Sequence, residues 1–536
     1  MAAAAHSTTD LRILKSIGFR AFLATQFLGA FNDNLFKLLL VCFAMNLLSR
    51  EQQNNYIPLA TALFTLPYIL FSSYAGFLAD RFSKRAVMIA TKAAEIAIMG
   101  CGYYFFRVHA TTPLLLVLFA MGAQSAFFGP AKYGFLPEVL PANALSRGNG
   151  AVQLFTFLAI ILGGAAAGRL ATMYIEPPPP AAMVEQAATA GEKLTGSTAT
   201  STPATSTPAT STPATSTPAT STPATSTPAS ALVTDTATAP NVLPQDRKYA
   251  HPPSAPASTA STDLGAIPVS VTGTSAGTTE LSVTTAPPAT VHLAAIYCVG
   301  IAVIGFIASL LIMPTPPGHR GAAFTWNPLS THWQTIRAMR KDHLLILCLF
   351  GNAFFWFIGV LFQSNLPLLV KNDLGASDQT VGLLLAAVAL GIGIGSSAAG
   401  FLSRGKIEYG LVLPGGFFMA LFAISLGLFG RWLAPAILCV SLMGFCSGFF
   451  QLPLVTAIQK RSPADRRGQF MGAVNAVDCL AMLLAAAFHW LLIKPLGLSA
   501  SAVFVVLGLL TLGVLLLMIK KAPALIWRAK QLSLRP

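Results

Sequence analysis

Long apolar stretches separated by short polar segments run along most of the chain. Twelve of them are close to or longer than about 20 residues, the length that a helix needs to cross the hydrocarbon layer of a bilayer. We predict membrane-spanning helices at about 20–47, 56–79, 86–106, 112–132, 148–174, 291–313, 344–369, 379–402, 409–430, 432–457, 468–493 and 498–519. The pattern therefore predicts an all-α polytopic membrane protein with twelve transmembrane helices.

The first apolar stretch carries polar residues near its centre. Asn32, Asp33 and Asn34 lie there, and Lys37 follows one helical turn later. An ionised side chain at bilayer depth costs about 3 kcal/mol or more, so such residues usually line a cavity or pair with one another. Asp33 and Lys37 are four residues apart and could simply form a pair along the helix. Asp33 and Lys37 could therefore contact a substrate or form a structural ion pair, and both interpretations stay open.

Composition and charge agree with a membrane protein. The chain has 536 residues, of which 54% are hydrophobic and only 10% charged, against about 25% charged in soluble domains. A net charge of +15 would favour nucleic acid in a soluble protein. Here 23 of the 34 lysines and arginines lie in segments on the side of the N-terminus, and nine lie on the other side. This bias predicts that both termini are cytoplasmic. The seven cysteines all lie in apolar stretches and indicate packing, not disulfides or metal ligation.

The chain repeats itself internally. Residues 121–128 (MGAQSAFF) resemble 443–450 (MGFCSGFF), Gly150-Ala151-Val152 recurs at 472–474, and Ala75-Gly76-Phe77-Leu78 recurs at 399–402. The displacement along the chain is nearly constant for the three matches, and they occupy equivalent helices. We therefore predict two six-helix pseudo-symmetric halves, an arrangement that resembles the major facilitator fold.

A charged loop after the second helix agrees with this fold. The segment 76–85 (GFLADRFSKR) resembles the major facilitator signature G-x-x-x-D-R-x-G-R-R, with Ser83 in place of a glycine. The candidate gating residues are Gly76, Asp80, Arg81, Lys84 and Arg85. They would form a charged clasp that breaks and reforms as the halves rock. The alternative is a basic anchor on the cytoplasmic side.

One long segment does not fit the repeat. Residues 175–290 include Pro177 to Pro180 and six pentads, mostly Ser-Thr-Pro-Ala-Thr, between Ser201 and Ser230. Such composition cannot bury enough apolar surface to fold, so we predict a disordered periplasmic insert. The expected organisation is an N-terminal half with helices 1–5 (1–174), the insert (175–290), helix 6 (291–313), a central cytoplasmic loop (314–343), a C-terminal half with helices 7–12 (344–519) and a cytoplasmic tail (520–536).

Several motifs resemble a narrower family. The segment 26–34 (QFLGAFNDN) resembles the Gln-Phe-Leu-x-Ala-Phe-x-Asp-Asn start of bacterial lysophospholipid transporters, and 129–138 (GPAKYGFLPE) and Phe355-Trp356 are similar to other segments of that family. Residues 405–412 (GKIEYGLV) resemble the transporter half of fused acyl-glycerophosphoethanolamine acyltransferases. The chain ends soon after the last span, without the His-x4-Asp acyltransferase region of those fusions. We therefore expect a transporter and not an enzyme.

The resemblance implies transport of a lysophospholipid, such as lysophosphatidylethanolamine, across the bacterial inner membrane. The candidate substrate-binding residues are Gln26, Asn32, Asp33, Asn34, Lys132, Asn352, Gln363, Asn365 and Asp478. A carboxylate suits an ammonium headgroup, and Lys132 suits a phosphate as a point charge. Standalone family members tend to carry an arginine where this chain has Gln363, which leaves the choice of headgroup open. Membrane lipids and a separate acyltransferase are the expected partners of a monomer that does not bind nucleic acid.

Competing functions share some of these residues. A proton-coupled drug or small-solute exporter could use Asp33 and Asp478 as proton carriers, and a scaffold that presents the insert is a third possibility. Lys92 and Glu95 are three residues apart and favour a local pair. No G-x-x-x-x-G-K-[ST] nucleotide loop and no metal-ligand cluster stands out, so we expect no cofactor.

Overall fold

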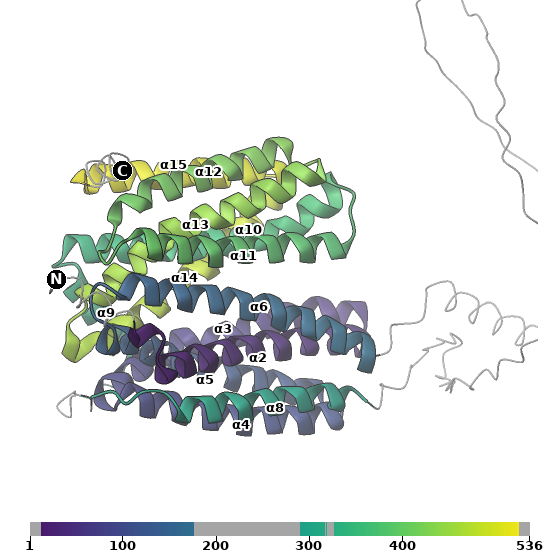
Figure 1. Ribbon diagram of the computed structural model, residues 1–536. Coiled ribbons are helices and arrows are strands. Elements are labelled where there is room, and N and C mark those ends of the chain that lie inside the picture. The colour runs from purple at the N-terminus through teal and green to yellow at the C-terminus, as the bar shows by residue number, and fades with distance from the viewer. Residues whose placement is uncertain (1–11, 176–289, 317, 319–325, 525–536) are drawn as a thin grey trace, which may run out of the picture. The chain divides into compact units, whose positions relative to one another are not determined.

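The computed structural model describes residues 12–175, 290–316, 318 and 326–524 (Figure 1). Its regular secondary structure in these ranges is helical, and twelve helices there are long and apolar enough to cross a membrane. The prediction of an all-α protein with twelve membrane-spanning helices is thereby confirmed.

The helices form two sets of six. The N-terminal half contains α2 (Ile17–Leu47), α3 (Arg50–Arg81), α4 (Lys84–Arg107), α5 (Thr111–Val139), α6 (Leu145–Tyr174) and α8 (Val291–Leu310). The C-terminal half contains α10 (His343–Leu368), α11 (Asp378–Leu402), α12 (Val412–Phe429), α13 (Leu433–Arg461), α14 (Arg467–Ile493) and α15 (Ala500–Lys521). Short turns of π-helix at Leu369–Asp373 and of 3-10 helix at Tyr409–Leu411 and Ala464–Arg466 adjoin them. A short helix, α9 (Pro328–Met339), lies in the segment expected to be only a loop.

Polar caps set where several of these helices begin. The side chains of Ser16 and Ser83 accept hydrogen bonds from backbone N–H groups in the first turns of α2 and α4. Ser49 and Gln52 form a reciprocal capping box at the start of α3. These caps pair amide groups that a helix leaves free at its N-terminus, which fixes the helix ends close to the short polar segments of the sequence.

Each half has its own apolar core. In the N-terminal half, Phe36 and Phe43 each meet the ring of Phe106 edge to face, at centroid distances of 5.6 and 5.3 Å. In the C-terminal half, Phe362 meets Phe504 in the same way at 5.7 Å. Figure 1 shows α10, α11, α12, α13 and α15 on one side and α2 to α6 with α8 on the other, and α14 extends between them.

Repeat-related glycines make equivalent contacts between the halves. A Cβ atom at Gly76 of α3 would lie 2.6 Å from the carbonyl oxygen of Gly468 in α14, and one at Gly400 of α11 would lie 2.8 Å from that of Ser146 in α6. Real Cβ atoms essentially never approach so closely, so both positions require glycine, which has no side chain. The sequence repeat that pairs Gly76 with Gly400 is thus also a repeat in three dimensions.

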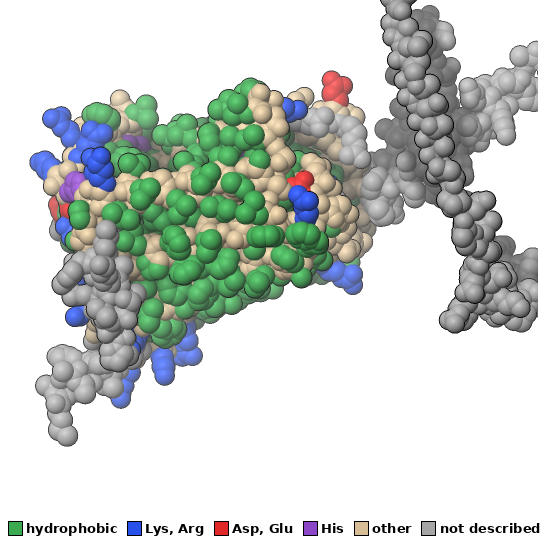
Figure 2. Space-filling model, turned by 90° about the horizontal axis from the view of Figure 1, so that it is seen from above, with side chains coloured by type: hydrophobic (Ala, Val, Ile, Leu, Met, Phe, Trp, Pro, Cys, Tyr) green, Lys and Arg blue, Asp and Glu red, His purple; other side chains and the backbone are tan. Residues whose placement is uncertain are grey.

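The two halves meet mainly at one end, where α3 stops, α6 and α14 begin, and α9 lies. We call this the α9 end. Eight of the ten buried residues of α14 precede its midpoint at Leu480, on the α9 side, whereas Leu483, Leu484 and Trp490 beyond it are exposed. Figure 2 shows Lys and Arg side chains gathered at the same end and apolar side chains over the middle. The described conformation is therefore closed at the α9 end.

The expected insert, 175–290, lies outside the described residues except for its two ends. There the hydroxyl of Thr290 donates to the carbonyl oxygen of Tyr174 at 3.1 Å, so the chain leaves α6 and returns to α8 at neighbouring points. Most of the expected tail, 520–536, also lies outside the described residues. The predicted organisation into these segments stays a prediction.

Candidate substrate cavity between the two halves

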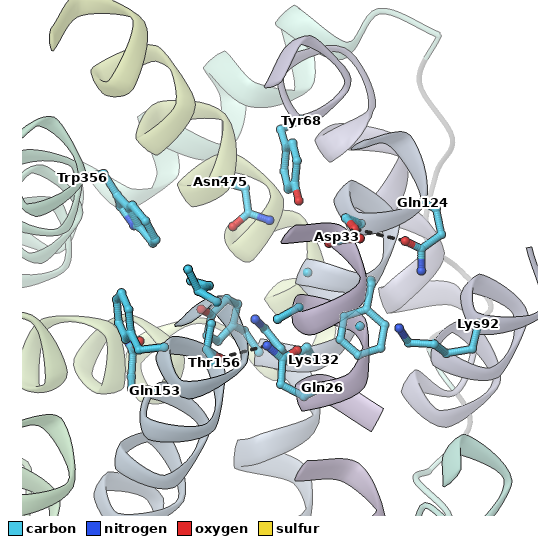
Figure 3. A pocket seen from close by; sticks show the side chains of 18 residues that line it. Gln26, Asp33, Tyr68, Lys92, Gln124, Lys132, Gln153, Thr156, Trp356 and Asn475 are labelled. Carbon is cyan, nitrogen blue, oxygen red and sulfur yellow. Dashed lines mark hydrogen bonds between the residues drawn. The ribbon is translucent and has the colours of Figure 1, made fainter. Parts of the chain in front are cut away.

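A cavity of about 220 Å³ lies between the halves, and the N-terminal half supplies 16 of its 18 lining residues (Figure 3). Its polar lining consists of Gln26, Asp33, Tyr68, Lys92, Gln124, Ser125, Lys132, Tyr133, Gln153, Thr156 and Asn475. Its other lining residues are Gly29, Ala30, Phe128, Gly129, Phe157, Ile160 and Trp356. Charge, hydrogen-bonding groups and an apolar wall thus meet in one space.

Asp33 presents a carboxylate to this cavity from α2. One of its oxygens accepts a hydrogen bond from Ser125 Oγ at 2.7 Å, and no other hydrogen bond or ion pair to Asp33 occurs among the described residues. In particular, Asp33 and Lys37 form no ion pair within 4.0 Å, and the Lys37 ammonium lies instead 5.4 Å from the centre of the Phe64 ring. The helical pair that the sequence allowed is therefore not made in this conformation.

Lys92 and Glu95 form a buried ion pair on α4. The Lys92 ammonium lies 2.5 Å from Glu95, and each side chain is only 2% exposed. The Glu95 carboxylate also accepts from Asn32 at 2.9 Å and from Gln124 at 3.3 Å. A buried charge pair is favourable only when further hydrogen bonds satisfy it, and this network supplies them. The local pair predicted from the sequence is present, but its ammonium also lines the cavity.

Gly29 makes room for that ammonium. A Cβ atom at Gly29 would overlap Lys92 Nζ, so any larger residue on this face of α2 would displace the lysine. Lys92 Nζ also lies 5.2 Å from the ring centre of Phe128, within the range of cation–π attraction. The position of the lysine in the cavity thus depends on α2 and α5 as well as on its own helix.

Lys132 and Gln26, two of the predicted substrate residues, complete the polar side of the cavity. Lys132 is half-buried on α5, with its ammonium 4.3 Å from the ring centre of Tyr133. Gln26 donates to the Thr156 hydroxyl at 3.0 Å, which joins α2 to α6. Figure 3 shows Asp33, Lys132 and Asn475 around a common space. A carboxylate and an ammonium are therefore available to a single small polar group.

The other predicted substrate residues lie outside the cavity lining. The Asn32 amide donates to the Glu95 carboxylate at 2.9 Å, and the Asn34 amide donates to the Ala30 carbonyl of its own helix at 2.8 Å. In the C-terminal half, Asn365 donates to the Ala500 carbonyl at 2.8 Å, and Gln363 is exposed. In this conformation these four residues do not contact the cavity.

Asp478 is buried in the C-terminal half beside Asn352. The Asn352 amide donates to both carboxylate oxygens, at 3.0 and 2.8 Å, and neither residue lines the cavity. No ion pair to Asp478 occurs among the described residues. The two intramembrane aspartates that the sequence singled out thus lie in different surroundings.

The structure adds cavity residues that the sequence reading did not select. Gln153 and Asn475 directly follow the two copies of the repeated Gly-Ala-Val segment, and both line the cavity. Trp356 comes from the Phe-Trp pair that had supported only the resemblance. The position after each repeated segment was the available signal, because two carboxamides at related places in a two-fold fold are expected to face the same axis.

The candidate gating residues divide into two groups. Asp80 joins the halves, because its two oxygens accept the backbone N–H groups of Gly468 and Gln469 at 2.5 and 2.8 Å. These N–H groups lie at the start of α14, where a helix favours a negative charge. Gly76 provides the close approach beside them.

The basic members act within the N-terminal half. Lys84 pairs with Glu138 at 2.5 Å, Arg85 donates to the Leu310 carbonyl at 2.7 Å, and Arg81 lies 5.8 Å from the ring centre of Phe77. Within the part of the chain that the structure describes, the hydrogen bonds of this predicted clasp that join the two halves are those of Asp80.

A further ion pair lies at the same end, within the C-terminal half. Asp342 pairs with Arg461 at 2.6 Å. Partial burial raises the pKa of Asp342, but hydrogen bonds from Arg461 and from the N–H groups of α10 outweigh it and hold that pKa below its usual value.

A metal site is not apparent at any of these positions. No group of three or more His, Cys, Asp or Glu side chains that could hold a metal ion occurs in the ranges that the structure describes.

A fold of two repeated six-helix halves around a polar cavity defines a class of membrane transporter. The profile of the Major Facilitator Superfamily matches residues 22–177, 270–486 and 360–533, and the chain belongs to this family.

More particular similarity is to bacterial lipid transporters. The chain is 34% identical over 162 residues to the lysophospholipid transporter LplT of Klebsiella pneumoniae, which covers 30% of this chain and 38% of that protein. It is 32% identical over 176 residues to LplT of Escherichia coli, a match that covers 33% of this chain and 41% of that protein. The chain thus matches about two fifths of the length of these relatives.

Solved structures agree on the fold. A variant of the Escherichia coli fucose:proton symporter FucP aligns with a TM-score of 0.62 at 10% identity, over 94% of this chain and 98% of that one. The human organic anion transporter MFSD10 aligns with a TM-score of 0.60 at 12% identity, over 93% and 99%. At such low identity these similarities concern the fold alone.

Proposed function

We propose that the protein moves lysophospholipids across the bacterial inner membrane by alternating access. One observation carries this proposal: a carboxylate and an ammonium, Asp33 and Lys132, line the same cavity beside an aromatic and aliphatic wall. A zwitterionic headgroup such as phosphoethanolamine requires a negative partner for its ammonium and a positive partner for its phosphate. The single acyl chain of the lysophospholipid requires an apolar surface. The similarity to lysophospholipid transporters over about a third of the chain supports the same substrate class.

The roles of the cavity residues follow from their charge. Asp33 would accept hydrogen bonds from the ammonium of the headgroup, because only one of its oxygens is engaged by the protein. Lys132 would hold the phosphate. Lys92 is already neutralised by Glu95, so it would shape the site more than hold the substrate. The apolar flank would consist of Phe157, Ile160 and Trp356.

The positive charge at the α9 end supports a cytoplasmic location for that end and for both termini (Figure 2). The described conformation would then face the periplasm. The insert 175–290 would be a periplasmic expansion, since its ends lie next to each other. Rocking of the halves would break the Asp80 contact with α14 and open the cavity to the cytoplasmic side. A separate acyltransferase would then reacylate the lipid, and we expect the transporter to act as a monomer.

Flipping in vesicles tests the proposal. Fluorescent lysophosphatidylethanolamine is added to one leaflet of proteoliposomes, and albumin then extracts whatever label remains accessible. Protein-dependent loss of extractable label is the expected result. A rate equal to that of empty vesicles would refute lysophospholipid transport. A rate that requires a pH gradient, together with transport of unrelated drugs, would favour the proton-coupled exporter instead.

A further inference from the structure

Gln153 belongs to the cavity and to the contact between the halves at the same time. It lies on α6, lines the cavity and is 6% exposed. Its Nε2 donates to Oε1 of Gln451 on α13, in the other half, at 2.5 Å. Gln451 is 2% exposed and does not line the cavity. A group inside the cavity can therefore reach Gln153 but not its partner.

This bond is the first of two amide contacts between α6 and α13. Closer to the α9 end, Asn149 lies one turn from Gln153 on α6, and Gln459 lies about two turns from Gln451 on α13. Asn149 and Gln459 exchange two hydrogen bonds of 2.7 and 2.9 Å, and both are at most 1% exposed. We call these four residues the amide ladder. Hydrogen bonds between buried amides hold membrane helices together because no water is available to replace them. The ladder therefore closes the α6–α13 contact between the cavity and the α9 end.

Gln451 also contacts a buried polar pair within the C-terminal half. Its own amide nitrogen lies 3.5 Å from Oδ1 of Asn352, which in turn donates to Asp478. A change at Gln153 thus reaches the buried carboxylate of the opposite half through two side chains. Asn365, also in the C-terminal half, donates to the Ala500 carbonyl, and its Oδ1 lies 3.4 Å from Nε2 of His489. Among the described residues this pair makes no such link to the cavity.

The internal repeat provides a natural comparison. The residue that corresponds to Gln153 is Asn475, and the one that corresponds to Gln451 is Gly129. Asn475 lines the cavity, but it packs on Gly129: its Nδ2 would lie 2.7 Å from a Cβ there. No hydrogen bond of the Asn475 side chain occurs among the described residues. Of these two related cavity amides, only Gln153 forms a hydrogen bond to the other half among the described residues.

We propose that Gln153 couples the occupant of the cavity to opening at the α9 end. An anionic oxygen of the headgroup accepts the Nε2 hydrogen bond of Gln153 and so takes it from Gln451, which weakens the closed contact. This step rests on the proposed transport function. Buried hydrogen bonds between membrane helices, when measured, change equilibria by about threefold on average and about twentyfold at most, which sets the size of the expected shift.

Hydrogen exchange of the full-length protein in lipid nanodiscs tests the coupling. The measured segments are 145–153 and 451–461, which carry the ladder. We expect lysophosphatidylethanolamine to speed exchange in the wild type. We expect Q451L to exchange about three to twenty times faster without lipid and to show no further rise when lipid is added. The double variant Q153L/Q451L leaves neither member of this pair as an unpaired buried amide and should exchange like Q451L.

The matched control is N475L, which removes the related amide that has no bond between the halves. It should leave exchange of both segments at the wild-type level in the absence of lipid. If Q451L and the double variant exchange like N475L, or if lipid speeds exchange in Q451L as much as in the wild type, the coupling is refuted. Failure of the proposed function looks different: no protein responds to the lipid, yet Q451L still exceeds N475L. That result would uphold the closing role of the bond and remove lysophosphatidylethanolamine as its trigger.

Discussion

The two halves share a fold but differ in the chemistry they bring to the cavity. The N-terminal half supplies Asp33, Lys92 and Lys132, whereas the C-terminal half supplies only Trp356 and Asn475. The repeat relates Lys132 to Leu454, which is buried and apolar. The duplication thus preserved the frame and the glycine contacts while charge stayed on one side. A cargo held by one half leaves the other half free to rock against it.

The largest expected effect is that of D33N, which removes the negative charge from the N-terminal wall. Hydrogen bonds to charged groups are worth about 1.5–3 kcal/mol, so transport of lysophosphatidylethanolamine should fall by about tenfold to a hundredfold. Albumin extraction from proteoliposomes measures this rate. Because Asn can still accept from Ser125, the fold should survive. Wild-type transport by D33N would show that the carboxylate does not meet the headgroup.

K132M should have the next largest effect. Loss of the half-buried ammonium removes the proposed partner of the phosphate. We expect transport in the same assay to fall by about tenfold, because a hydrogen bond to a charged group is worth about 1.5 kcal/mol or more and Lys92 is already paired with Glu95. K132R is the matched control and should keep most of the activity. Equal loss in K132R and K132M would point to shape, and not to charge, as what matters at this position.

Asp478 is the counterpart that sharpens the comparison. D478N keeps one acceptor oxygen for Asn352 and lies outside the cavity lining. Transport should therefore stay within about threefold of the wild type, the effect of one neutral hydrogen bond. The same flipping assay measures it beside D33N. A loss as large as that of D33N would place essential charge in the C-terminal half and end the asymmetry described here.

The smallest effect is expected from D342N, which breaks an ion pair within the C-terminal half. Asp342 and Arg461 are 29% and 40% exposed, and such pairs contribute about 0–1 kcal/mol. Because the folded pKa of Asp342 lies below its usual 3.8, its contribution is present at neutral pH and disappears as the pH falls through that lower value. D342N should therefore have a slightly lower melting temperature than the wild type at pH 7. The difference between the two melting temperatures should disappear once the pH falls below the lowered pKa of Asp342. A gap that widens in acid would contradict this assignment.

The sequence was sufficient for the fold because the signals are long and redundant. Twelve apolar stretches and a repeat such as Gly76 with Gly400 each constrain the same architecture. Helix α9 was missed because its 12 residues mix polar and apolar positions inside a segment too polar to span a membrane. It forms by burying His332, Thr335 and Met339 against the bundle, which no local pattern of spans reveals.

The cavity was only partly predictable. Gln26, Asp33 and Lys132 were selected, because a charge or amide within a span has few other uses. Lys92 was explained by its neighbour Glu95, and its second role depends on the space left by Gly29 on another helix. Gln363 was predicted to bind substrate because it is a polar residue within a span, but it lies on the exposed side of its helix. Which face a residue occupies is set by packing between helices, and one sequence does not contain it.

The most direct test of this account is a headgroup exchange in the flipping assay. Wild-type and D33N proteoliposomes are compared with lysophosphatidylethanolamine, which carries an ammonium, and with lysophosphatidic acid, which carries only the phosphate. We predict that the wild type moves lysophosphatidylethanolamine about tenfold faster or more, and that D33N loses this preference because it slows only the ammonium lipid. If D33N kept the wild-type preference, or if neither lipid moved faster than in empty vesicles, the proposed headgroup site in the N-terminal half would be wrong.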